Sequence, residues 1–202
     1  MALNVPLIST LHDGIVPAGM VGEAFILRRD GVELELQSAP VARGTYRAAG
    51  RVFMTTARLC FVPFDAGAGG GVIHSVELPL AGIRDVDYKQ PFFGANSLVG
   101  RILPLPGRGL DAAGGGGAPF RIVFKTGSAA TLLHFLWRLM EQYANADAAA
   151  RAAFVRASSA PVAAPAFVAA QTAFFDPADP SVVFLTQPAW AAPAPAPPAP
   201  AP

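Results

Sequence analysis

Alternation of apolar and polar residues along the first two-thirds of the chain predicts a series of short β-strands. The clearest case is the stretch where Val32, Leu34 and Leu36 alternate with two glutamates and a glutamine. A period of two is typical of a strand with one buried and one wet face. We expect about seven short strands in all. The other runs lie at residues 25–27, 50–64 (two runs), 73–80, 83–88, 97–103 and 120–125.

The hydrophobic period changes after residue 127. Five apolar or aromatic residues follow at spacings of i, i+4, i+7, i+8 and i+11, which places them on one stripe of a helix. They are Leu132, Leu136, Leu139, Met140 and Tyr143. We expect an amphipathic helix here, with alanine-rich sequence extending it as far as Phe154. About seven strands followed by one helix is the order of a pleckstrin-homology-like barrel, in which the helix plugs an open end.

Two flanking segments differ in composition from this predicted domain, which spans residues 23–156. Residues 1–22 mix apolar residues with Pro and Gly without a sustained period, and we expect an irregular lead-in. Residues 157–202 contain no Lys or Arg and eleven prolines, so we expect a disordered or polyproline-like tail. Its two apolar islands, 174–175 and 182–185, are either peptides that dock on a partner or on the barrel, or segments without a role.

Composition and residue spacing favour a non-catalytic protein. The net charge is +1, which gives no general attraction to nucleic acid or anionic membranes, and we expect no direct sequence-specific nucleic-acid binding. The single cysteine, Cys60, lies in an apolar run and is expected to be a buried, inert thiol. The three histidines, His12, His74 and His134, are far apart, so we expect no metal site, no cofactor and no enzyme activity.

An octapeptide between the runs 83–88 and 97–103 combines turn residues with two aromatics. Its sequence is Lys89, Gln90, Pro91, Phe92, Phe93, Gly94, Ala95 and Asn96. Pro91 has no N–H for a sheet ladder, and Gly94 tolerates a positive φ. Phe92 and Phe93 are either a plug that closes the barrel or a surface that a partner contacts. We favour the plug, because aromatic side chains next to turns usually belong to the core.

Arginines gather in the stretch between Glu35 and Asp65, which contains no acidic residue. They are Arg43, Arg47, Arg51 and Arg58. If the strands bring them together, they form a basic patch for an anionic lipid headgroup or a phosphorylated peptide, since the planar guanidinium donates bidentately to phosphate. Ordinary solvated charges on a strand face are the alternative, and strand parity separates Arg58 from Arg47 and Arg51.

The octapeptide resembles the lysine-glutamine-proline-x-phenylalanine-glycine-alanine-asparagine signature of the GRAM domain in the WW-domain-binding protein 2 family. The resemblance covers roughly residues 1–143, and further segments agree with the family pattern in order and spacing. They are Met1 to Asn4, Gly44-Thr45, Gly50 to Thr56, Arg58 to Phe61 and Phe120 to Gly127.

This resemblance implies a pleckstrin-homology-like fold and a non-enzymatic adaptor. Members of the family act as transcriptional coactivators associated with chromatin, and WW domains bind proline-proline-x-tyrosine motifs in their tails. Here the tyrosines are Tyr46, Tyr88 and Tyr143, all inside the domain, so no such motif exists in the tail. We therefore expect an adaptor that acts through protein contacts in the nucleus, including chromatin-associated proteins, without the usual WW motif. The alternative, common in the wider GRAM group, is a membrane-associated module that binds phosphoinositide.

We expect a location in the nucleus and cytoplasm, without a signal peptide or a transmembrane segment. The first Lys or Arg is Arg28, so the N-terminal stretch lacks the charged region of a signal peptide. The most apolar helical candidate, 129–140, contains His134 and Arg138 and is too short to span a bilayer, so we expect no transmembrane segment.

Overall fold

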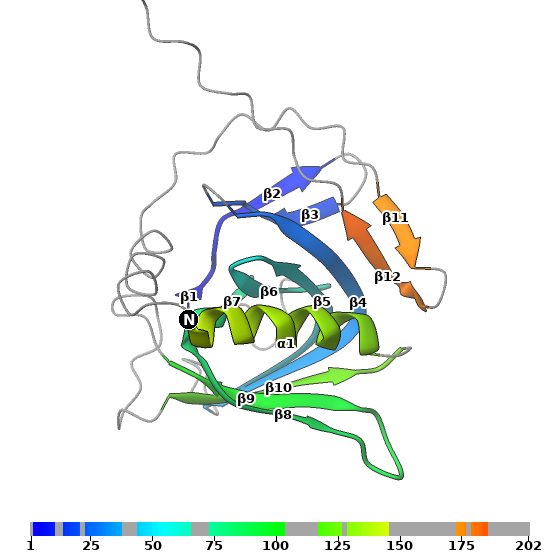
Figure 1. Ribbon diagram of the computed structural model, residues 1–202. Coiled ribbons are helices and arrows are strands. Elements are labelled where there is room, and N and C mark those ends of the chain that lie inside the picture. The colour runs from blue at the N-terminus through cyan, green and yellow to red at the C-terminus, as the bar shows by residue number, and fades with distance from the viewer. Residues whose placement is uncertain are drawn as a thin grey trace, which may run out of the picture.

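One antiparallel sheet curls around a core, and a helix covers it (Figure 1). The computed structural model describes residues 2–10, 14–20, 23–37, 44–65, 73–103, 117–126, 129–145, 173–176 and 179–185. Seven strands, in the order β7-β6-β5-β4-β10-β9-β8, form the main part of the sheet. They are β4 (Phe25–Gln37), β5 (Thr45–Thr55), β6 (Arg58–Pro63), β7 (Val76–Pro79), β8 (Ile83–Lys89), β9 (Ser97–Ile102) and β10 (Ala118–Phe124).

The alternating pattern of β4 sets the inner face of the curled sheet. Val32, Leu34 and Leu36 are buried in the main core, whereas the intervening glutamates are only partly covered. The same strand pairs with β5 on one side and with β10 on the other, so the first and last of the seven strands are neighbours. This pairing curls the sheet into a half-barrel that remains open between β7 and β8.

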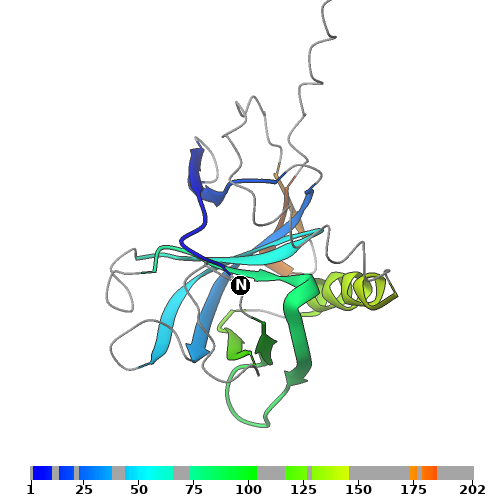
Figure 2. The ribbon, with the colours of Figure 1, turned by 90° about the vertical axis from the view of Figure 1, so that its left-hand side faces the viewer.

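A helix covers the opening of the half-barrel. β7 and β8 are joined by η2 (Leu80–Gly82), and α1 (Ala130–Asn145) packs against that connection. Figure 1 shows α1 between β5–β7 and β8–β10, and Figure 2 shows it to one side of the strands. Leu132 and Leu136 are buried, and the rest of the expected stripe packs against the core. Seven strands closed by one helix confirm the expected pleckstrin-homology-like fold; the expected extension to Phe154 lies outside the described residues.

α1 is 16 residues long, and none of the helices in the described part of the chain has the length and apolar character needed to cross a bilayer.

The N-terminal lead-in is more regular than its sequence suggests. β1 (Ala2–Leu3) pairs with β7, and β2 (Leu7–Thr10) forms a hairpin with β3 (Gly14–Pro17). The expectation of an irregular segment is therefore wrong for these residues. These strands are two to four residues long, too short to show a period, and β1 owes its conformation to a partner more than 70 residues away.

Part of the expected disordered tail also belongs to the sheet. β11 (Ala173–Asp176) and β12 (Asp179–Leu185), orange in Figure 1, form a hairpin, and β12 pairs with β4. The structure contradicts disorder for these two segments. The island 182–185 docks on the barrel through the pairing of β12 with β4, whereas the island 174–175 pairs with β12. Val182 and Val183 are buried there, which supplies apolar contacts that the tail lacks by itself. The rest of 157–202 lies outside the described residues.

Candidate interaction site at the β8–β9 hairpin

The expected signature segment forms the turn of the β8–β9 hairpin. Lys89 pairs with Ser97 at the last position of the ladder, and the residues between them make the turn. Gly94 has a φ of 104°, a backbone conformation that glycine adopts more readily than other residues. The turn extends beyond the curled sheet in both ribbon views (Figures 1 and 2). We refer to residues 90–95 as the hairpin tip.

Phe92 and Phe93 are fully exposed at this tip. Their relative exposures are 104% and 95%, so the expectation that they plug the barrel is wrong. The barrel opening is covered by α1, while the hairpin directs its turn away from the core. Leaving a Phe side chain in water rather than burying it costs about 1.5–3 kcal/mol. Two adjacent aromatics in this position therefore form an apolar contact surface that the described part of the fold does not use.

The charges beside the tip largely offset each other. Lys89 forms an ion pair with Asp87, and both side chains are exposed. The hydrogen bond from Lys89 lowers the pKa of the Asp87 carboxyl from its usual value, so this carboxylate is charged at neutral pH. The tip therefore presents an apolar surface flanked by a neutralised charge pair rather than by a basic cluster.

Among the residues described, Arg58 does not join the predicted arginine patch, and Arg47 and Arg51 each lie beside an acidic side chain. Arg47 donates from Nε and Nη2 to Glu33 Oε1, at 2.9 and 2.7 Å, and lies 3.3 Å from Glu35. Burial raises the pKa of the Glu33 carboxyl, but the interactions with Arg47 and Lys125 together outweigh burial, so the pKa is lowered from its usual value. Arg51 lies 4.0 Å from the Asp30 carboxylate, with its guanidinium 5.2 Å from the centroid of the Phe64 ring.

The other two arginines of the predicted patch are elsewhere. Arg58 is buried, with 3% of its surface exposed, and Arg43 lies outside the described residues. The stretch between Glu35 and Asp65 contains no acid, but β4 supplies acids from across the sheet, since Glu35 is directly opposite Arg47. Sequence spacing along one strand cannot show this cross-strand compensation.

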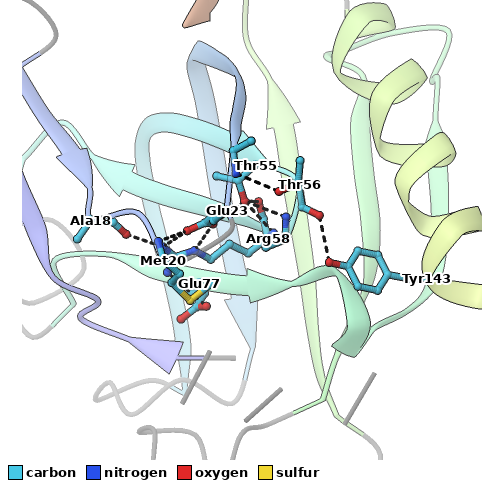
Figure 3. Close-up of polar contacts among 10 residues, drawn as sticks. Ala18, Met20, Glu23, Thr55, Thr56, Arg58, Glu77 and Tyr143 are labelled. Atoms are coloured by element: carbon cyan, nitrogen blue, oxygen red, sulfur yellow. Dashed lines mark hydrogen bonds and ion pairs between the residues drawn. The ribbon is translucent and has the colours of Figure 1, made fainter. Parts of the chain in front are cut away.

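Arg58 belongs instead to a buried polar network, which we call the Glu23–Arg58 network (Figure 3). Its Nε and Nη2 donate to the Glu23 carboxylate at 2.7 and 2.8 Å, and Nη1 lies 3.4 Å from Glu77. Thr55 Oγ1 and the Met20 N–H also donate to Glu23, at 2.6 and 2.8 Å. The network joins the segment before β4 to strands β5, β6 and β7.

The electrostatics of this network are those of a structural ion pair. Burial by itself lowers the pKa of the Arg58 guanidinium, but the Glu23 and Glu77 carboxylates raise it above its ordinary value. The neighbouring Cys60 is buried as expected, and burial raises the pKa of its thiol, so it is protonated at neutral pH. A protonated, buried thiol is a poor nucleophile.

A shallow groove of about 350 Å³ separates α1 from the start of β8. Its walls are mainly apolar and include Met140, Tyr143 and Ile83. Arg84, at the rim, donates to the carbonyl oxygens of Ala81 and Ile83, so its guanidinium is engaged with the backbone. Within the described segments, no group of three or more His, Cys, Asp or Glu side chains is arranged to hold a metal ion.

Comparison with known proteins shows distant similarity to a WW domain-binding protein. No protein-family model matches the chain. The human WW domain-binding protein 2 is 30% identical over 111 residues, which is 53% of this chain and 39% of that protein; the rat protein gives the same identity. A stress-induced protein of Schizosaccharomyces pombe is 24% identical over 123 residues, covering 60% of this chain and 67% of that protein. The match thus spans about two-fifths of the human protein.

Among solved structures, the Vps36 N-terminal PH domain aligns with 72% of this chain and 97% of its own length. The TM-score is 0.49 and the sequence identity is 16%.

Proposed function

We propose that this protein is a non-enzymatic adaptor that binds partner proteins by inserting Phe92 and Phe93 into an apolar pocket. The observation that carries the proposal is the complete exposure of two adjacent aromatic side chains at the hairpin tip. Protein interfaces depend on a few large side chains that fill pockets on the partner, and aromatic residues are enriched among them. A short hairpin is suited to this role because its backbone is held by the β8–β9 ladder.

The proposal extends to the class and location of the protein. It is a GRAM-domain protein of the WW-domain-binding protein 2 type that acts in the nucleus as a chromatin-associated coactivator. The similarity to WW domain-binding protein 2 and the octapeptide at the hairpin tip support this assignment. Because the chain has no proline-proline-x-tyrosine motif, the partner contact is assigned to the hairpin tip and not to the usual WW-binding motif.

A protein partner suits the surroundings of the tip better than an anionic membrane does. Electrostatic attachment to a membrane requires several Lys or Arg side chains close to the inserted residues. Lys89 is offset by Asp87. Of the described arginines in the predicted patch, Arg47 is engaged by a carboxylate, Arg51 packs on an aromatic ring and Arg58 is buried. An apolar tip without a basic rim is typical of docking into a protein pocket.

Site-specific photocrosslinking in cells tests the proposal. The full chain carries a photoreactive phenylalanine derivative at Gln90, which is exposed beside the two aromatics. We expect discrete crosslinked proteins from nuclear extract, reduced roughly tenfold by the double substitution Phe92→Ser and Phe93→Ser, since central aromatic anchors dominate binding energy. Phe64→Ser is the matched control, because Phe64 is a half-exposed phenylalanine distant from the turn in sequence.

Two results would contradict the proposal. One is a set of crosslinked proteins that the double substitution leaves unchanged. The other is sedimentation of the full chain with phosphatidylcholine vesicles, with or without phosphatidylinositol 4,5-bisphosphate, that the double substitution abolishes. The second result would make the tip a membrane anchor instead.

A further inference from the structure

The N-terminal half of β4 has an edge that β10 does not cover. β4 pairs with β10 only from Val32 to Leu36, and the register shifts between Arg29 and Val32. Gly31 has a φ of 67° at this shift, and a Cβ there would lie 2.1 Å from Thr126 Oγ1. The irregularity therefore requires glycine, and it separates the part of β4 that pairs with β10 from the part that accepts another strand.

β12 occupies this edge through two adjacent residues. Val182 pairs with Arg29 and Val183 with Arg28, in antiparallel register. Successive side chains of a strand point to opposite faces of the sheet. Accordingly, Val182 is fully buried in the main core, while Val183, 5% exposed, belongs to a second cluster on the other side. The second cluster also contains Val16, Phe25, Phe53, Cys60 and Val62.

The residue opposite Val182 is held firmly in place. Arg29 is fully buried, its guanidinium lies 5.8 Å from the centroid of the Phe124 ring, and it donates a hydrogen bond to the Thr126 carbonyl oxygen. The edge of β4 at Arg28–Arg29 thus pairs with the backbone of a neighbouring strand and is flanked, on each face of the sheet, by a cluster of buried apolar side chains. This combination defines what fits: an extended segment with two consecutive aliphatic, β-branched residues.

We infer that this edge of β4 is a strand-accepting site that binds an extended peptide of a partner protein, and that β12 is its built-in competitor. Addition of a strand to a sheet edge gives affinity through the backbone and specificity through alternate side-chain pockets. The 27 residues between Asn145 and Ala173 tether β12 to the domain. Because β12 and β4 belong to the same chain, β12 is an intramolecular competitor whose effective concentration a partner peptide must overcome. The surface differs from the hairpin tip and does not depend on it.

The test uses the full chain with a specific protease site introduced within residues 157–168. A labelled peptide with the sequence of residues 173–185 is the probe, and its fluorescence anisotropy reports binding before and after cleavage. Cleavage removes the tether, so we expect the peptide to bind the cleaved protein at least roughly tenfold more tightly than the uncleaved protein. The peptide with Val182→Asp should lose binding by a similar factor or more, whereas the peptide with Val182→Ile should bind.

A matched control separates this site from the hairpin tip. The protein with Phe92→Ser and Phe93→Ser, cleaved in the same way, should bind the peptide unchanged. Equal binding of the Val182→Asp peptide, or no gain on cleavage, would overturn the inference. So would loss of the β-sheet circular dichroism signal when the cleaved tail exchanges, because β12 would then be an integral part of the core. If the protein forms a dimer that the peptide does not dissociate, the edge would instead be assigned to a second copy of the chain.

Discussion

A charged residue is buried in the Glu23–Arg58 network, and apolar residues are exposed at the hairpin tip. Both placements are the reverse of what the residue types suggest. Arg58 is 3% exposed, whereas Phe93 is 95% exposed. Inside the network, each part of the guanidinium meets a carboxylate or a carbonyl oxygen, including the Ala18 oxygen at 2.6 Å, so the cost of removing the charge from water is offset. At the tip, no described element covers the aromatics.

The difference between the two regions separates residues that are tied to folding from residues that are available for the proposed contact with a partner. The network connects the N-terminal segment to three strands, so its side chains are tied to folding. The tip projects past the last pairs of the ladder, so its side chains contribute little to the described fold. Substitutions in the first region should therefore unfold the protein without a specific effect on partners, and substitutions in the second should do the reverse.

The largest effect is expected from Arg58→Met, which removes the charge but keeps the side-chain length. It leaves the Glu23 and Glu77 carboxylates buried without their cation, and breaking a buried ion pair in this way costs about 3–5 kcal/mol. Urea denaturation measures the loss in the free energy of unfolding. Arg47→Met is the matched control on the adjacent strand: its guanidinium is exposed to solvent, so a much smaller loss than in Arg58→Met is expected. Equal losses in both variants would remove the distinction between buried and exposed arginines.

An intermediate effect is expected from Tyr46, whose hydroxyl is buried without a hydrogen-bond partner among the described residues. Burial raises its pKa to about 12, above the usual value of 10.0. In the unfolded chain the phenol loses its proton near pH 10, while the folded protein retains it, so stability falls as the pH rises from about 10 to about 12. The two-unit shift corresponds to about 2–3 kcal/mol.

Tyr46→Phe tests this effect of pH. The substitution should change the free energy of unfolding little at pH 7 and should make its decline between pH 10 and 12 shallower than in the parent protein. Denaturation with urea at a series of pH values measures both quantities. Parallel pH profiles for the two proteins would show that Tyr46 does not contribute to the decline.

The smallest effect on stability is expected at the tip itself. Phe92→Ser and Phe93→Ser together should change the free energy of unfolding by no more than about 0.5 kcal/mol, as is usual for exposed positions. Urea denaturation of the double variant beside the parent protein checks this. A loss of several kcal/mol would mean that the aromatics pack on the domain after all, and the comparison between the two regions would fail.

Local pattern predicted the elements that depend on near neighbours in the sequence. The alternation at Val32, Leu34 and Leu36 predicted the inner face of β4, and the stripe through Leu132 and Leu136 predicted α1, because both periods follow from backbone geometry alone. The burial of Cys60 followed from its apolar run. The sequence was a poorer guide to which candidate site residues are exposed, because the exposure of a side chain depends on which distant segment covers it.

Three expectations failed for this reason. Arg47 pairs with Glu33 and Glu35 from the facing strand, and Arg58 pairs with Glu23, which lies 35 residues away. In the lead-in, β1 pairs with the edge of β7, and in the tail, β12 pairs with the edge of β4. In each case the decisive partner was remote in sequence, and a one-dimensional pattern carries no information about cross-strand register.

The sequence by itself thus predicted, within the described residues, the strands with a buried and a wet face and the amphipathic helix α1, since those depend on periods of two and 3.6 residues. Only the tertiary structure decided that Arg58 and Val182 are buried and that Phe92 and Phe93 face solvent. The physical reason is that burial depends on the packing of whole elements: the curl of the sheet, the position of α1 over its opening and the direction in which the β8–β9 hairpin projects.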